Sequence, residues 1–305
     1  MNLFNFGVPS AELHFSLNAS QDRPKLKIPD DNNNKTPKDQ EIALFRDDEA
    51  VTGVLTVIVD AGKRLEHTGL KLEFLGIIEV PLDRSSNFEF TNSVRELQAS
   101  GQVLEGEETF AFDFAQVEKP HESYYGRSVK LRYILRATLL RGSYASSLVH
   151  EQDLWVQRVA PPPPIDRSIK MEVGIEDCLH IEFEYDKSRY HLKDVVIGKI
   201  FFLLVRIKIK HMELAILRRE TLGSGAQRHS ESETVTKFEI MDGAPIKGES
   251  VPVRLYLAPY ELTPTYRSVQ SRFSVKYFIN LVLVDEEDRR YFKQQEIVLW
   301  RKSID

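Results

Sequence analysis

The chain has 305 residues, and 42% of them are hydrophobic, which is enough for folded cores and too many for a disordered chain. Domains average roughly 150 residues, so this length indicates about two domains. The net charge is −5, with charged residues of both signs interspersed. This balance argues against nucleic-acid binding, which requires a concentrated basic face.

Cysteine content and hydropathy indicate a cytoplasmic protein. Cys178 is the only cysteine, so the chain forms no internal disulfide and suits a reducing compartment. Its apolar neighbours favour a small core residue over a reactive thiol. Residues 1–9 lack the basic and apolar regions of a signal peptide. Residues 195–209 form the most apolar stretch, but Lys199 and Arg206 interrupt it, so it is too short and too charged to span a bilayer.

Alternation of apolar and polar residues predicts β-strands along the whole chain. The predicted strands span residues 51–59, 70–80, 110–114, 129–137, 179–185, 195–209, 253–257, 275–284 and 291–300. Within 129–137, Val129, Leu131 and Tyr133 alternate with Lys130 and Arg132, as in a strand with one buried face. Short polar turns separate the strands, and this pattern is typical of β-sandwiches.

Helical signals are weak. Residues 91–97 predict one or two helical turns, with Asn92 or Ser93 as the N-cap. Elsewhere no stretch sustains apolar residues at the helical period. We therefore expect an all-β fold.

A run of prolines at residues 161–164 marks a domain boundary. Consecutive prolines cannot continue a sheet ladder and favour a stiff, extended spacer. We therefore place the domains at residues 1–163 and 164–305. Residues 22–41 and 222–234 are rich in polar and turn-forming residues and predict flexible loops.

The sequence contains no recognisable catalytic or metal-binding motif. His180 alternates with Glu182 and Glu184, which could form a metal-binding cluster, but a solvated strand face accounts for the same pattern. No G-x-S-x-G elbow is present, and we interpret the acidic residues 285–288 as a solvated turn, not as an acid/base pair. We expect no enzyme activity, no cofactor and no bound metal.

Two segments are candidates for binding other proteins. Ile240 and Met241 precede Asp242 and Gly243, a strong turn signal. The two apolar side chains either lie in the core under the turn or project outward as an anchor for a partner, and the residues alone favour the core. Residues 169–175 follow the prolines closely and predict an edge strand, whose backbone could pair with an extended peptide.

Several long segments of the chain are far more specific than any short motif. They are GKRLEH (62–67), QVEKP (116–120), SIKMEVGIEDCLHIEFEY (168–185), YHLKD (190–194), HMEL (211–214), EIMDGAP (239–245) and VDEEDRRYFKQQE (284–296). Together they resemble the vacuolar protein sorting-associated protein 26 family, the arrestin-like subunits of the retromer complex. The resemblance covers nearly the whole chain and departs from the family at residues 22–41, 161–164 and 222–234.

The resemblance implies an arrestin-like fold of two β-sandwich domains joined by a short Pro-rich linker, and a non-catalytic role in endosomal cargo sorting. The second domain is expected to dock on the α-helical solenoid subunit, vacuolar protein sorting-associated protein 35. The implied solenoid-binding residues are Ile240, Met241, Asp242 and Gly243. This favours the outward anchor over the core interpretation, since apolar knobs in a helical groove act as hot spots.

The resemblance also implies a cargo site beside a sorting nexin. Cargo tails are expected to add as an extended strand, with an apolar cargo residue packing by Phe292. The implied cargo and sorting-nexin residues are Ile169, Met171, Val173, Ile175 and Phe292. Ordinary strand packing is the alternative for these positions. The protein would be cytoplasmic and peripheral on endosomal membranes, held there indirectly by its partners.

A second interpretation is an arrestin-like adaptor for phosphorylated receptor tails. It requires exposed basic residues that hold phosphate. Lys130, Arg132 and Arg136 share one strand face and are the candidates, although the pattern favours a solvated face. A third class, a hydrolase, has no motif in the sequence.

Overall fold

A computed structural model describes residues 11–18, 23–28, 40–81, 87–142, 145–162, 166–175, 177–223 and 228–302. The chain divides into two compact units, Met1–Arg158 and Val159–Asp305. The predicted boundary after residue 163 falls on residues 163–165, which lie outside the described residues. Each unit is described by itself.

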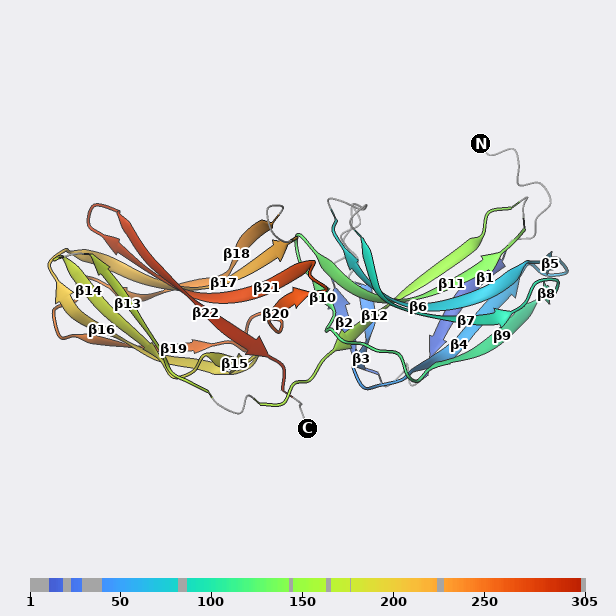
Figure 1. The fold of residues 1–305 in the computed structure, drawn as a ribbon, viewed down its shortest axis with the longest axis horizontal. Helices are drawn as coiled ribbons and strands as arrows, with labels where there is room; N and C mark the ends of the chain where they lie inside the picture. The colour runs from blue at the N-terminus through green and yellow to red at the C-terminus, as the bar shows by residue number, and fades with distance from the viewer. Residues whose placement is uncertain are drawn as a thin grey trace. The chain divides into compact units, whose positions relative to one another are not determined.

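The first unit is built from two main layers of strands, which pair antiparallel except for the parallel pair β3 and β12 (Figure 1). Its strands are β1 (Ala11–Leu17), β2 (Lys25–Ile28), β3 (Gln40–Arg46), β4 (Val51–Val59), β5 (Arg64–Glu66), β6 (Gly69–Glu79), β7 (Phe88–Gln98), β8 (Val103–Glu105), β9 (Glu107–Phe114), β10 (Tyr124–Tyr125), β11 (Lys130–Leu140) and β12 (Leu148–Gln157). One sheet has the order β1-β4-β9, and the other β2-β3-β12-β11-β6-β7, with β10 beside β11. Strands β5 and β8 form a separate pair.

Sequence alternation explains the core of this unit. Along β4, Val51, Leu55 and Val57 are fully buried, and they alternate with the half-buried residues Thr52, Val54 and Thr56. Strands β6 and β11 pair over eleven positions, from Gly69 opposite Leu140 to Glu79 opposite Lys130, and their central residues are buried on both faces. Central strands of this kind show near-continuous apolar runs instead of strict alternation.

The second unit is also a two-layer β-sandwich (Figure 1). Its strands are β13 (Ile169–Ile175), β14 (Leu179–Tyr185), β15 (Arg189–His191), β16 (Val195–Val205), β17 (Ile209–Leu222), β18 (His229–Asp242), β19 (Ser250–Tyr256), β20 (Tyr266–Val269), β21 (Phe273–Asp285) and β22 (Arg290–Trp300). The four-stranded sheet has the order β13-β14-β16-β19. The other sheet has the order β15-β22-β21-β17-β18, with β20 beside β21.

Close packing between β14 and β16 depends on one glycine. A Cβ atom at Gly198 would lie 2.8 Å from the carbonyl oxygen of Glu184 and 2.9 Å from the ring of Phe183. Both distances are shorter than van der Waals contact, so this position excludes any larger residue without movement of the neighbouring strand. Phe183 and its neighbours on β14 fill the centre of the sandwich.

The all-β fold is confirmed, and the described residues contain no helix. Two predictions of local structure are wrong. Residues 91–97 are not helical but belong to the edge strand β7, which pairs with β6. Residues 195–209 are not one strand, because a turn at residues 206–208 separates β16 from β17 and Arg206 N donates to Cys178 O.

The two predicted loops are shorter than expected. Segment 22–41 contains β2 and the beginning of β3, and segment 222–234 contains the beginning of β18. The rest of these loops, residues 29–39 and 224–227, lies outside the described residues. In the part of the chain that is described, no helix is long and apolar enough to cross a membrane.

Candidate protein-interaction sites

Ile240 and Met241 lie at the end of an edge strand, where a β-bulge changes their direction. Strand β18 is the last strand of its sheet and has no buried residue. Met241 pairs with Met212 and Glu239 pairs with Glu213, so Ile240 is the extra, unpaired residue of the bulge. Bulges re-aim side chains and are common next to functional sites. Ile240 and Met241 are both half-buried, so neither is simply a core residue.

A tight turn follows the two apolar residues directly. Asp242 and Gly243 are exposed, and Gly243 has a φ of 105°, a left-handed conformation that favours glycine. The Gly243 N–H donates to the carbonyl of Lys210 over 2.8 Å, which fixes the turn against β17. The knob, defined as Ile240 and Met241, is therefore presented by a turn that is hydrogen-bonded to the neighbouring strand.

Charged residues of the β21–β22 turn border the knob. Lys210 Nζ lies 3.0 Å from a carboxylate oxygen of Asp288, and Glu286 N donates to Lys208 O. The prediction of a solvated turn at residues 285–288 is wrong for Asp285, whose side chain is buried. An apolar centre with a charged rim is the usual anatomy of a protein-binding site.

The prediction that residues 169–175 form an edge strand is confirmed. Strand β13 covers these residues and is the outermost strand of the four-stranded sheet. Met171 and Val173 are buried, whereas Ile169 and Ile175 are half-buried. These side chains therefore face the sandwich core, and what β13 offers to a peptide is its backbone.

The hairpin turn fixes which backbone groups of β13 are free. Cys178 N donates to Ile175 O over 3.0 Å, so the carbonyl of Ile175 points toward β14. Backbone direction alternates along a strand. The N–H and C=O groups of Gly174 and Glu172 therefore point away from β14, toward the open edge. An extended peptide could pair with these groups by strand addition.

Phe292 is an exposed aromatic residue of β22. Its side chain is 64% exposed on β22, opposite Val282 of β21. On the other side of β22, strand β15 pairs only with Val298, Leu299 and Trp300, so the stretch around Phe292 lacks a described neighbour there. Strands β13 and β22 contact each other across the sandwich. Phe292 thus presents an exposed ring at a sheet edge that is open in the described part of the chain.

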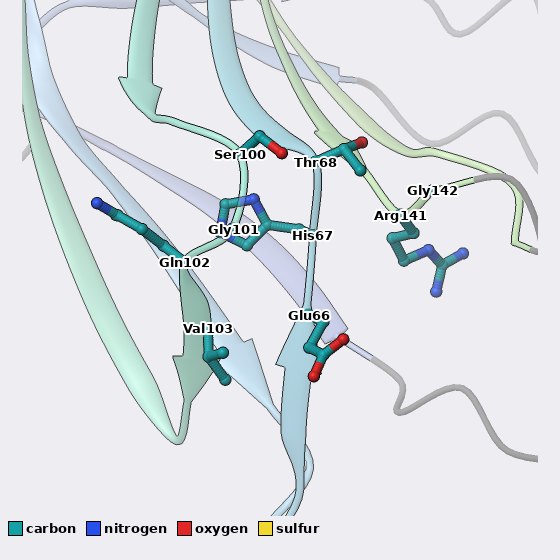
Figure 2. Close-up of a pocket in the computed structure, with 9 residues that line it drawn as sticks. All are labelled: Glu66, His67, Thr68, Ser100, Gly101, Gln102, Val103, Arg141 and Gly142. Carbon is teal, nitrogen blue, oxygen red and sulfur yellow. The ribbon is translucent and has the colours of Figure 1, made fainter.

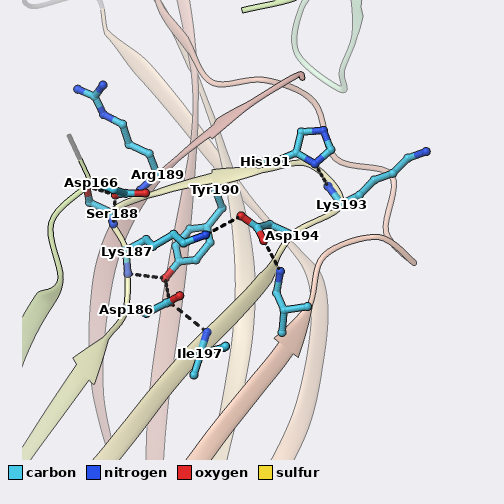
Figure 3. A network of polar contacts seen from close by, with 11 residues as sticks. Asp166, Asp186, Lys187, Ser188, Arg189, Tyr190, His191, Lys193, Asp194 and Ile197 are labelled. Carbon is cyan, nitrogen blue, oxygen red and sulfur yellow. Dashed lines mark hydrogen bonds and ion pairs between the residues drawn. The ribbon is translucent and has the colours of Figure 1, made fainter. Parts of the chain in front are cut away.

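A polar network holds the beginning of β13 in place (Figure 3). One carboxylate oxygen of Asp166 accepts hydrogen bonds from the N–H groups of Ser188 and Arg189. In the same turn, the hydroxyl of Tyr190 donates to Asp186 over 2.8 Å. Burial and this hydrogen bond raise the pKa of Tyr190, so the phenol stays protonated and remains a donor. The network ties the approach to β13 to the β14–β15 turn.

Comparison with known proteins identifies the family. The family model described as "Vacuolar protein sorting-associated protein 26" matches residues 7–288. The chain belongs to the vacuolar protein sorting-associated protein 26 family. A protein of that name from Dictyostelium discoideum is 54% identical over 307 residues, covering 100% of this chain and 86% of the relative. Vacuolar protein sorting-associated protein 26B from Xenopus tropicalis is 54% identical to this chain, and the protein of that name from Homo sapiens is 52% identical. Each alignment spans 304 residues and covers 99% of this chain and 88% of the relative.

This member of the vacuolar protein sorting-associated protein 26 family carries an open cavity in its first unit (Figure 2). The cavity has a volume of about 430 Å³ and lies between the segments that join β5 to β6 and β7 to β8. The ring of His67 donates to Gln98 Oε1 over 2.8 Å and accepts from Gly69 N over 3.1 Å. Both ring nitrogens are thus engaged, so His67 is not available as a base for nearby Ser100.

The basic residues proposed for phosphate binding are already paired. Arg132 binds Asp153 through two nitrogens, at 2.9 and 3.0 Å, and binds Glu79 at 2.7 Å. Arg136 donates to Glu151 over 2.7 Å. These carboxylates occupy the guanidinium donors that a phosphate would need. The geometry therefore weighs against the receptor-tail adaptor.

The histidine cluster differs in membership from the sequence interpretation. His180 lies with Glu182 and Glu172, whose ligand atoms are within 4.8 Å of one another, and not with Glu184, which pairs with Lys170. Glu172 comes from β13 and is the register partner of Glu182. Spacing along β14 alone could not predict that Glu172 belongs to this cluster, because Glu172 is brought next to His180 by the pairing of β13 with β14.

Proposed function

We propose that the protein is a non-catalytic scaffold subunit of the retromer coat. In this role it binds the α-solenoid subunit, vacuolar protein sorting-associated protein 35, and helps a sorting nexin recruit the cytoplasmic tails of transmembrane cargo. The cargo is then retrieved from endosomes to the Golgi or the plasma membrane. The protein acts on the cytoplasmic side, peripheral to the endosomal membrane, and reaches that membrane through its partners.

The knob at the end of β18 is the observation that carries this proposal. Ile240 and Met241 are half-buried, lie at a bulge, and precede a turn that is hydrogen-bonded to Lys210 through Gly243 N. Rigid apolar side chains lose little conformational freedom on binding, which makes them effective anchors in a helical groove. Asp242 and Gly243 contribute the exposed turn beside them.

The open edge of β13 supports the cargo role. Ile169, Met171, Val173 and Ile175 direct their side chains inward, so they shape and support the edge while the backbone receives the peptide. Phe292 is the apolar surface against which a cargo side chain packs. A strand-addition site reads a short extended segment and tolerates varied sequences, as a sorting adaptor requires.

The experiment that tests the proposal uses the variant Ile240→Asp with Met241→Asn. Two polar residues in the groove of the solenoid would be buried without partners, so we expect binding to fall at least about 100-fold. Isothermal titration with the purified solenoid subunit measures this. The far-ultraviolet circular dichroism should stay unchanged, because the knob lies outside the sandwich core.

A matched control is Val235→Asp, which places the same charge at another half-buried position of β18 away from the turn. We expect this variant to bind the solenoid subunit like the unmodified protein. Unchanged affinity for the knob variant would reject the knob as the solenoid site, and absence of binding by the unmodified protein would reject the scaffold role.

A further inference from the structure

Three side chains that can bind a metal ion lie together on the outer face of the four-stranded sheet. His180 and Glu182 belong to β14, and Glu172 belongs to β13. The imidazole nitrogen and the two carboxylate oxygens that they offer all lie within 4.8 Å of one another. The three residues alternate with buried residues such as Val173 and Ile181, so their side chains point away from the core. One nitrogen and two oxygen donors form a ligand set that is typical of zinc.

The pairing of β13 with β14 brings the three side chains to one place. Glu172 lies directly opposite Glu182, and Gly174 lies opposite His180. The backbone groups of Glu172 and Gly174 point away from β14, so both are non-hydrogen-bonded pairs, in which opposite side chains lie closest. A Cβ atom added at Gly174 would meet only the carbonyl oxygen of Leu179, at 3.4 Å. The space beside the imidazole is therefore open, and the ring can turn toward the two carboxylates.

The donor atoms of this cluster are not engaged elsewhere. None of its three side chains makes a hydrogen bond or an ion pair with another described residue. Glu184, the next carboxylate along β14, differs because it pairs with Lys170 over 3.6 Å. The adjacent strand β16 carries the exposed Lys199, whose ammonium lies 5.1 Å from the centre of the Phe201 ring and is not ion-paired with the cluster. The imidazole and both carboxylates are thus available to a ligand.

The spacing of the donors suits one small cation. Zinc binds nitrogen and oxygen at about 2.0–2.2 Å, so two ligand atoms of a tetrahedral ion lie about 3.3–3.6 Å apart. From a separation of at most 4.8 Å, each pair of donors closes this gap by moving about 1.5 Å or less. Glu172 is exposed and the other two residues are half-buried, so rotation of the side chains provides this movement. Calcium and magnesium favour oxygen ligands, so the imidazole selects against them.

We propose that Glu172, His180 and Glu182 form a binding site for a divalent transition-metal ion, zinc above all. This inference goes beyond the proposed function and does not depend on it. Three protein ligands leave the fourth tetrahedral position to water, because the outer side of the site faces solvent. The ion joins the edge strand β13 to β14 through side chains, in addition to the backbone ladder. Only the folded sheet brings the three ligands together, so zinc stabilises the native chain.

The test is isothermal titration of the full-length chain with zinc chloride, after metal has been removed by dialysis against a chelator. We expect the unmodified chain to bind one zinc ion at this site, and magnesium chloride to give no binding. His180→Asn, Glu172→Gln and Glu182→Gln each remove one ligand. Loss of an outer-shell contact alone weakens metal binding about 10–100-fold, so loss of a ligand should weaken zinc binding at least about 100-fold.

Two controls come from the same hairpin. Glu184→Gln removes a carboxylate from the same face of β14, and Cys178→Ser removes the thiol two positions before His180. Neither residue belongs to the cluster, so both variants should bind zinc like the unmodified chain. Thermal unfolding midpoints without metal show that each variant is folded. Zinc should raise the midpoint of the unmodified chain and of both controls, but not that of the three ligand variants.

The outcomes decide the site directly. Zinc binding that is lost in the folded ligand variants and kept in both controls supports it. A chain that does not bind zinc, or that still binds zinc with full affinity in all three ligand variants, overturns it. Loss of zinc binding in Cys178→Ser would place the ion at the thiol and would also overturn the assignment. The scaffold role is tested separately by the knob variant, so it stands or falls independently of zinc binding.

Discussion

Asp285 shows how one buried carboxylate can organise a whole turn. Its two oxygens accept four hydrogen bonds: from Glu287 N, from Arg289 N, from Arg289 Nε over 2.7 Å and from the hydroxyl of Tyr291. Burial by itself would raise the pKa of Asp285, but the hydrogen bonds from Arg289 and Tyr291 outweigh it and lower the pKa to about 2. The turn that borders the knob is therefore built around an ionised carboxylate.

Substitution Asp285→Asn should lower the thermal unfolding midpoint at neutral pH by a few degrees, because the turn loses its charge-assisted hydrogen bonds. The pKa of Asp285 is lower in the folded chain than in the unfolded chain. Its contribution to stability is thus complete above about pH 4 and disappears as the pH falls toward 2. Thermal unfolding between pH 2 and pH 7 should show a smaller difference between variant and unmodified chain at the acidic end.

The neighbouring exposed residue provides the control for this prediction. Glu286→Gln removes only a surface ion pair with Lys208, so its unfolding midpoint should change little at any pH. A constant difference between Asp285→Asn and the unmodified chain across the whole pH range would contradict the role assigned to Asp285.

Single residues were the hardest part of the molecule to predict from sequence. The sequence predicted that Ile240 and Met241 end a strand before a turn, and the residue types alone favoured a position in the core for both. Their half-buried position depends on a bulge, which is a matter of register between β17 and β18. The order of apolar and polar residues within β18 does not reveal how β18 is aligned with β17. A bulge therefore cannot be located from the sequence of one strand. The same reason hid the grouping of Glu172 with His180.

At the scale of elements, the free edge of β13 makes a prediction about proline. The N–H of Glu172 points to the open edge, whereas the N–H of Val173 points to β14. Proline is tolerated on an edge strand where the missing N–H would face solvent. We therefore expect Glu172→Pro to change the urea unfolding midpoint only slightly, and Val173→Pro to destabilise the chain by about 1–3 kcal/mol, because it removes a ladder hydrogen bond and leaves its acceptor unpaired.

Val173→Ala serves as the control for lost apolar volume, because it shortens the buried side chain and keeps the N–H. It should be less damaging than Val173→Pro. Equal destabilisation by Glu172→Pro and Val173→Pro would mean that both N–H groups are bonded within the fold, and the edge would not be open for strand addition.

Elements with regular alternation were predicted well, and those without it were not. Strand β14 matches its predicted bounds, since Leu179, Ile181 and Phe183 alternate with charged residues. Strand β7 was missed because it is an edge strand with no buried residue, so its polar composition resembled a helix start. The turn between β16 and β17 was missed because apolar residues continue on both sides of it.

At the scale of the whole molecule, each unit has its own sheets, and no described sheet combines strands from both units. The backbone around the junction reflects this division. Arg158 N donates to Glu122 of the first unit, and Arg158 Nη1 donates to Pro120 O. Two residues later, Ala160 N donates to Arg301 O of the second unit over 2.9 Å. The proline run in the sequence predicted a boundary at residue 163. Only the contacts of the folded chain show that the residues just before the prolines belong to the second unit.

These contacts predict how fragments of the second unit behave. A fragment of residues 159–305 keeps the bond between Ala160 and Arg301, whereas a fragment of residues 164–305, cut at the boundary predicted from sequence, loses it. Both should unfold cooperatively, since the sandwich has its own core. One backbone hydrogen bond contributes about 0.5–1.5 kcal/mol, so the shorter fragment should unfold a few degrees lower in differential scanning calorimetry.

The substitution Ala160→Pro in the longer fragment separates this bond from chain length, because proline removes the N–H and leaves all residues in place. Its unfolding midpoint should match that of the shorter fragment. If the shorter fragment and the proline variant are both as stable as residues 159–305, the contact with Arg301 contributes nothing, and the second unit begins after the prolines. If neither fragment folds, the second sandwich depends on the first, and the division into two independent units is wrong.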